Sequence, residues 1–262
     1  MGLFKPIWMT DNTKKCDKAL AAVQKLSDAS QLEDAAINAP LGMVAEAACS
    51  RITDQASLAA VAIHAGHRWV AKQAVSRMDD PSLLVKVAME AGTDKGGRAA
   101  AERVADQSAL AQIARSAPDA YTRIAAMQKL DDLGIVAEVA CRDANHDVQI
   151  KAIERITDPQ VIEDIARNEQ DHYVRTAALE KIDSLELIRD IEASWNQEQR
   201  SATSYANMLT GAVHQIIDEK AEQAKRASEG RCPHCGALLT TPRGGVPDGA
   251  AAYCSNCGGR VN

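Results

Sequence analysis

The tetrapeptide Arg51-Ile52-Thr53-Asp54 decides the fold, because its pattern returns every 26 residues along most of the chain. Each copy has a basic residue, an aliphatic residue, any residue and then Asp. Five further copies start at Lys25, Arg77, Arg103, Lys129 and Arg155, and a seventh, Lys181-Ile182-Asp183-Ser184, ends in Ser instead. A period that holds without gaps is typical of a repeat protein, in which each unit stacks on the next.

Two short helices per repeat are predicted from the residues around this signature. The Asp suits an N-cap, since its carboxylate can accept hydrogen bonds from the first amides of a helix. Pro81 and Pro159 follow it at the first helical position, where Pro is well tolerated. The first helix, helix A, then has apolar residues at intervals of three and four, which make one buried stripe. The leading residues of this stripe are Leu32, Leu58, Leu84, Leu110, Val136, Ile162 and Ile188.

The second helix, helix B, has an alanine in its middle, where a small side chain lets neighbouring helices approach closely. This column is Ala48, Ala74, Ala100, Ala126, Ala152 and Ala178. One helix pair cannot bury its own apolar face, so the pairs must stack. We therefore predict an all-α fold, a right-handed α-solenoid over residues 12–195. We expect a frayed or bent point at Gly96-Gly97, where neighbouring repeats start helix B with Val.

The repeat unit resembles HEAT-like repeats, especially their short forms in bacterial proteins. HEAT units usually have ~40–47 residues, so a different short-helix solenoid, such as a leucine-rich-repeat variant, is the alternative. The HEAT-like resemblance implies binding of another protein along a curved surface.

The segments that flank the repeats are expected to cover the ends of the solenoid. Residues 1–11 form an apolar cap segment through Leu3, Phe4, Ile7 and Trp8. After Trp195 the period stops, and one longer amphipathic helix is predicted from Leu209, Val213, Ile216 and Ile217. Because its last turns are polar, we assign residues 196–230 to a capping helix and a helical arm, which lead to a separate module at 231–262.

That last module contains two Cys-x-x-Cys pairs, which predict one structural metal site. The ligands are Cys232, Cys235, Cys254 and Cys257, with 18 residues between the pairs. Four thiolates in a tetrahedral set suit zinc and leave no open position for catalysis. The competing interpretations are a rubredoxin-type iron site, a redox dithiol pair and two disulfides.

Short apolar runs at 237–241 and 251–253 predict the two strands of a β-hairpin between these pairs. Residues 231–262 thus resemble a zinc ribbon. So short a module cannot bury a sufficient core alone, so bound metal should supply much of its folding energy.

Composition excludes several classes of protein. The net charge of −6 argues against non-specific nucleic-acid binding by the whole surface. The sequence has no run of 18 or more apolar residues, so no membrane-spanning helix is predicted. Seven cysteines, four of them in a metal-type cluster, fit a reducing cytoplasm. We interpret Cys49 and Cys141 as small core residues. No catalytic constellation or phosphate loop is found, so neither an enzyme nor a small-molecule substrate is expected.

Two columns of the repeat lie outside the apolar stripe. The basic ladder, which comprises Lys25, Arg51, Arg77, Arg103, Lys129, Arg155 and Lys181, lies at helix C-termini, where the helix dipole stabilises a cation. We favour a structural ladder over a phosphate-binding track. The helix-B column comprises Met43, Trp69, Tyr121 and Tyr173 at the start of helix B. Its members either anchor a partner protein or staple helix B to its loop.

Two functions follow from these patterns. The first is a non-enzymatic cytoplasmic adaptor, whose solenoid binds another protein and whose zinc ribbon makes a further contact. The alternative is a nucleic-acid-associated factor that touches RNA or DNA through Arg231, Arg243 and Arg260 of the ribbon. Ribbons serve both purposes, and the acidic balance of the chain favours the adaptor.

Overall fold

The computed structural model describes residues 6–93, 95–198, 205–229, 231–237, 254 and 256–257, with backbone only for 196–198 and 205–210. Within these ranges the regular elements are helices. The chain divides into two compact units, Met1–Ile156 and Thr157–Asn262. None of the helices in the described ranges is long and apolar enough to cross a membrane.

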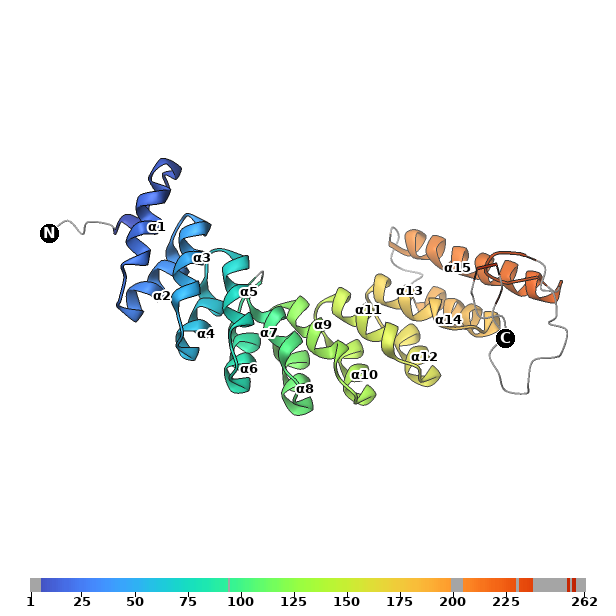
Figure 1. The fold of residues 1–262 in the computed structure, drawn as a ribbon. Helices are drawn as coiled ribbons and strands as arrows, with labels where there is room; N and C mark the ends of the chain where they lie inside the picture. Colours follow the sequence, from blue (N-terminus) through green and yellow to red (C-terminus); the bar gives the residue numbers. More distant parts are fainter. Residues whose placement is uncertain are drawn as a thin grey trace, which may run out of the picture. The chain divides into compact units, whose positions relative to one another are not determined.

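The first unit consists of short helices that pair in sequence order, as the repeat predicts (Figure 1). Two short 3-10 turns, η1 (Ile7–Met9) and η2 (Thr13–Lys15), and helix α1 (Cys16–Gln24) come first. The pairs that follow are α2 (Ala29–Asn38) with α3 (Gly42–Arg51), α4 (Gln55–His64) with α5 (Arg68–Ser76), α6 (Pro81–Glu90) with α7 (Gly97–Arg103), α8 (Gln107–Ser116) with α9 (Ala120–Gln128), and α10 (Leu133–Arg142) with α11 (His146–Arg155).

These helices form two layers. The even-numbered A helices from α2 to α10 contact one another in order, and so do the odd-numbered B helices from α1 to α11. The predicted apolar stripe of helix A and the alanine column of helix B are buried throughout. The core therefore lies between the layers, and the small alanines allow the close approach that the sequence indicated.

The aspartates of the signature cap the A helices. Asp54, for example, accepts a hydrogen bond from the amide of Ser57 at 2.7 Å. The same kind of contact is made at the first turn of the following helix by Asp28, Asp80, Asp106, Asp132 and Asp158. In the seventh copy the Ser184 hydroxyl accepts from the amide of Leu187 at 3.2 Å. The predicted N-caps are thus confirmed.

The basic ladder binds backbone carbonyls of the preceding repeat. Arg77 donates from Nη1 to the carbonyl of Cys49 at 2.5 Å and from Nη2 to that of Ile52 at 2.6 Å. Equivalent bonds reach back from Arg51 to Val23, from Arg103 to Val75, from Lys129 to Glu102, and from Arg155 to Leu130. These carbonyls lie at or just past the end of a B helix. Those of Val23, Cys49 and Val75 also accept the amide three residues further on, so the basic side chain adds a second donor there. These contacts confirm a structural function for the five ladder cations from Arg51 to Arg155.

The glycine pair is a close-packing point, and the expectation of a frayed or bent point needs correction. Helix α7 is short, with 7 residues, because it starts only at Gly97. Gly96 is buried, and its amide donates to the carbonyl of Ala62 at 3.0 Å. A Cβ at Gly96 would lie 2.8 Å from that same oxygen, and one at Gly97 would lie 2.8 Å from Thr122 Oγ1. Two glycines therefore let the start of α7 touch α4 and α9.

The second unit continues the pairing and ends in longer helices. Helix α12 (Pro159–Asn168) pairs with α13 (His172–Glu180), α14 (Leu185–Glu198) contacts α12, and α15 (Tyr205–Ser228) contacts α13 and α14. Val213, Ile216 and Ile217 of α15 are buried, as are Ile188, Ile191 and Trp195 of α14. The predicted amphipathic helix is confirmed, except that the side chain of Leu209 lies outside the described residues.

Two cysteines outside the cluster differ from each other. Cys49 is fully buried, and burial raises the pKa of its thiol to about 11, so it is an inert core residue. Cys141 is exposed, and its interpretation as a core residue is wrong. In α10 the buried positions are Val136, Val139 and Ala140, and the residue after Ala140 points away from that stripe.

We predict that Gly96→Ala destabilises the protein although Ala is the better helix former. The added Cβ meets a backbone oxygen that cannot move away, and such overpacking costs about 1–3 kcal/mol. Gly92→Ala is the matched control, because nothing lies within 4 Å of its Cβ. Urea unfolding should show Gly92→Ala within about 0.5 kcal/mol of wild type. Equal stability of the two variants would show that α7 is not closely packed at Gly96.

Candidate metal centre and exposed helix-B column

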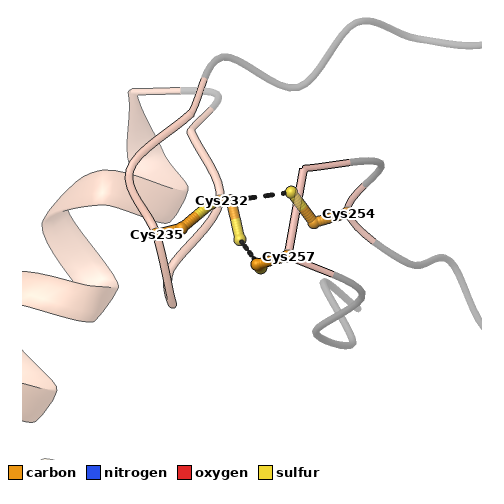
Figure 2. Close-up of side chains that lie close together, drawn as sticks. All are labelled: Cys232, Cys235, Cys254 and Cys257. Atoms are coloured by element: carbon orange, nitrogen blue, oxygen red, sulfur yellow. Dashed lines mark hydrogen bonds between the residues drawn. The ribbon is translucent and has the colours of Figure 1, made fainter.

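The four predicted ligands come together from two loops (Figure 2). The sulfur atoms of Cys232, Cys235, Cys254 and Cys257 all lie within 4.8 Å of one another. The Sγ atoms of Cys232 and Cys257 are 3.7 Å apart, and so are those of Cys235 and Cys254. A tetrahedral ion with metal–sulfur bonds of ~2.3 Å would hold its sulfurs about 3.8 Å apart. The cluster therefore fits one metal ion, and the sulfur separations are too long for disulfides.

The first loop is shaped by its own backbone. The amide of Gly236 donates to the carbonyl of Cys232 at 2.8 Å, and the amide of Cys232 donates to the carbonyl of Ala237 at 2.8 Å. Gly236 has a φ of 73°, in the left-handed region that side chains disfavour. This turn brings the two thiols of the pair close to each other.

Amide donors around the cluster favour the thiolate form. Asn256 donates from its backbone to Cys254 Sγ at 3.4 Å and from its side chain to Cys235 Sγ at 3.5 Å. The Asn256 side chain, followed by the amide of Ala237, lowers the pKa of Cys235 to about 6. Cys235 is thus a thiolate at neutral pH, which is the state that binds a metal. Cys232 and Cys254 are buried, whereas Cys235 and Cys257 are exposed.

The remainder of the module is only partly described. The predicted hairpin strands at 237–241 and 251–253 lie outside the described residues apart from Ala237, which is not in a strand. Arg243 and Arg260 lie outside them as well. Arg231 donates from Nη1 to the carbonyl of Gly236 at 3.0 Å, so it supports the cysteine loop. Its amide donates to the carbonyl of Arg226 at 2.8 Å, which joins the loop to the end of α15.

The helix-B column is exposed, as predicted from its place in the repeat. The exposed fractions are 66% for Met43, 51% for Trp69 and 57% for Tyr121 in the first unit. Tyr173 is 55% exposed in the second unit. All four begin a B helix, so they present apolar surface on the B layer of the unit to which each belongs.

Trp69 is exposed and also packs locally, which agrees with the interpretation of this residue as a staple. Its ring lies 4.7 Å from that of His67, centroid to centroid. The ring covers Gly42 of the preceding repeat, where a Cβ would come within 2.1 Å of Cζ2. One face of the indole therefore rests on the start of α3, while half of the side chain stays exposed.

Basic residues next to the column escaped the sequence analysis. Lys95 has the same repeat position as Trp69 and Tyr121, and Lys72 and Arg98 share another position. The 26-residue period brings such residues onto one edge of the B layer. The sequence therefore contains the signal for a basic surface, namely charged residues that recur at the 26-residue spacing.

Comparison of the chain with protein-family models, with curated proteins and with solved structures gives no match. The functional inference therefore rests on the geometry of the chain itself. Within the described residues, the four cysteines are the one group of three or more potential ligands that could hold a metal ion.

We predict that the purified chain binds one equivalent of Co²⁺ with the visible spectrum of tetrahedral thiolate ligation. Cys232→Ser removes a buried ligand, so it should weaken Co²⁺ binding and lower the intensity of the sulfur-to-cobalt charge-transfer band, because a water can fill the fourth position but carries no thiolate. Cys141→Ser changes an exposed cysteine outside the cluster and should keep it. Titration of both variants by absorbance, with zinc competition, checks the assignment. Unchanged affinity and charge-transfer intensity in Cys232→Ser would exclude this ligand set.

Proposed function

We propose that this chain is a non-enzymatic scaffold that binds another protein, built from a HEAT-like solenoid and a structural zinc ribbon. The observation that carries the proposal is the helix-B column. Six large apolar side chains are exposed in the described part of the chain, and four of them are Met43, Trp69, Tyr121 and Tyr173. Scattered exposed apolar residues need no explanation, but their concentration at one repeat position is typical of an interaction surface.

The residue types of the column support protein binding. Trp and Tyr are enriched among the residues that dominate binding energy, because one rigid side chain buries much area and keeps a polar group for hydrogen bonding. Recurrence of such side chains in several repeats suits a partner that contacts more than one repeat. In this proposal, the packing of Trp69 on Gly42 pre-orients the indole rather than hiding it, since half of it stays accessible.

The zinc ribbon has a structural function in this proposal. Four thiolates complete a tetrahedron, so a bound zinc ion has no position left for a substrate. Thiols that hold a metal must stay reduced, which places the protein in a reducing compartment such as the cytoplasm. The ribbon then offers a second surface for contacts beyond the end of α15.

A nucleic-acid function receives less support. The members of the basic ladder from Arg51 to Arg155 donate to backbone carbonyls, so those cations are engaged inside the fold. Arg231 likewise donates to the carbonyl of Gly236. With a net charge of −6, the chain lacks the cationic excess with which phosphate backbones are usually bound.

We predict that Trp69→Ala, Tyr121→Ala and Tyr173→Ala together abolish capture of the partner from native lysate while the melting temperature changes little. Loss of a true anchor costs about 2 kcal/mol or more of binding. Leu133→Ala is the matched control, because Leu133 is also large, apolar and exposed but lies outside the column. Affinity capture with mass spectrometry, with and without nuclease, provides the measurement.

Two results would contradict this proposal. A large drop in melting temperature for the triple variant would show that the rings are structural staples. Capture that is unchanged in the triple variant, or lost after nuclease treatment, would place the binding surface elsewhere or favour the nucleic-acid alternative.

A further inference from the structure

A basic pocket lies on the B layer of the first unit, beside the exposed column. Its volume is about 280 Å³, and it is lined by Arg68 and Lys72 of α5, Lys95 and Arg98 at the start of α7, and Asp119 and Tyr121 at the start of α9. Four of the six lining residues are cations and one is an acid.

The carboxylate of Asp119 is already engaged. Asp119 is only 5% exposed, and its Oδ2 accepts from the amide and the hydroxyl of Thr122, both at 2.9 Å. It therefore acts as the N-cap of α9, and the four cations of the lining still outnumber this one acid.

The cations of the pocket differ in whether they already make hydrogen bonds or ion pairs within the protein. Lys95 donates to the carbonyl of Ala65. Arg98 pairs with Glu102 at 2.9 Å, but both side chains are more than half exposed, so that pair is weak. Lys72 is exposed and makes no ion pair with any residue that the structure describes. The pocket therefore presents positive charge to solvent in a chain whose net charge is negative.

We infer that this basic pocket, flanked by Trp69 and Tyr121, binds an acidic peptide segment of the partner protein. The inference rests on the proposed function and specifies the chemistry of the partner. Aspartate or glutamate side chains would pair with Lys72 and Arg98 in charge-assisted hydrogen bonds. Apolar side chains on either side of the acidic residues would contact the two aromatic rings.

The spacing of the helices sets the expected separation of the two apolar residues in the partner peptide. Trp69 and Tyr121 lie on α5 and α9, and α7 lies between them in the B layer. Packed helices are about 8–10 Å apart, so the two rings are separated by two such steps, or about 18 Å. An extended chain rises ~3.3 Å per residue, so the two apolar residues of the partner lie about five or six positions apart, with acidic residues between them.

Nucleic acid fits this surface less well than a short acidic peptide. The repeat position of Lys72 and Arg98 is occupied by Glu46 in the preceding repeat and by Ile124 in the following one. The basic surface thus covers two repeats and is bounded by an acid and an apolar residue. A polyanionic strand gains affinity from a long run of cations, whereas a peptide with a few carboxylates needs only this pocket.

Selection from a random peptide library displayed on phage tests the inference on the full chain. The library should carry at least about 12 positions, twice the expected span. We expect the selected peptides to have Asp or Glu between two apolar residues. One selected peptide, labelled for fluorescence anisotropy, should bind Lys72→Glu at least about tenfold more weakly than wild type. Its binding should also weaken as sodium chloride is raised.

Lys86→Glu is the matched control, because Lys86 is exposed on α6 and makes the same charge change outside the pocket. It should bind the peptide within about twofold of wild type. Equal losses for both variants would overturn the inference, since they would report only net charge. Circular dichroism melts of both variants must match wild type, which ensures that lost binding does not reflect unfolding.

The remaining outcomes separate this inference from the proposed function. Selected peptides without acidic residues whose binding is lost in Trp69→Ala would overturn the inference and leave the scaffold proposal standing. Peptides insensitive to both Lys72→Glu and Trp69→Ala would contradict both. Stronger competition by a single-stranded oligonucleotide than by unlabelled peptide, or a dimer in sedimentation that Lys72→Glu dissociates, would assign the pocket to nucleic acid or to a second copy of the chain.

Discussion

The hydrogen bonds from a basic side chain to the carbonyls that end the preceding B helix are the contacts on which the stack of repeats depends. Each α-helix leaves about four amides and four carbonyls without a partner inside the helix. In helices of 7 to 10 residues, such as α7 and α8, these unpaired groups are a large share of the backbone. A solenoid of short helices is therefore stable only if its helix ends are capped systematically.

The repeat signature meets this requirement with two residues three positions apart. Arg77 closes the end of helix B in the preceding repeat, and Asp80 caps the start of the next A helix. Because the first residue reaches backwards and the second acts locally, one tetrapeptide joins two neighbouring units. The cations of the protein therefore fall into two groups with different surroundings. The ladder cations are directed to backbone carbonyls, whereas Lys72 and Arg98 at the start of helix B remain at the surface.

Much of this architecture could be predicted because it repeats. The caps, the apolar stripe and the alanine column each recur at a fixed interval, so the sequence samples every feature several times. The four metal ligands were equally clear, since their spacing is local. The close packing of Gly96 was out of reach, because it depends on how near α4 comes to α7. The basic pocket was missed because its residues come from three repeats.

Urea unfolding of Arg77→Met tests the central claim, that the basic ladder holds the repeats together, most directly. Methionine keeps much of the apolar stem but removes the donors to Cys49 and Ile52. Bonds from a charged donor contribute about 1.5–3 kcal/mol, so the free energy of unfolding should fall by about 2 kcal/mol. Lys86→Met, at an exposed position of α6, should stay within about 0.5 kcal/mol of wild type. If Arg77→Met were as stable as Lys86→Met, the ladder would not be structural, and its cations would have to be reconsidered as ligand-binding groups.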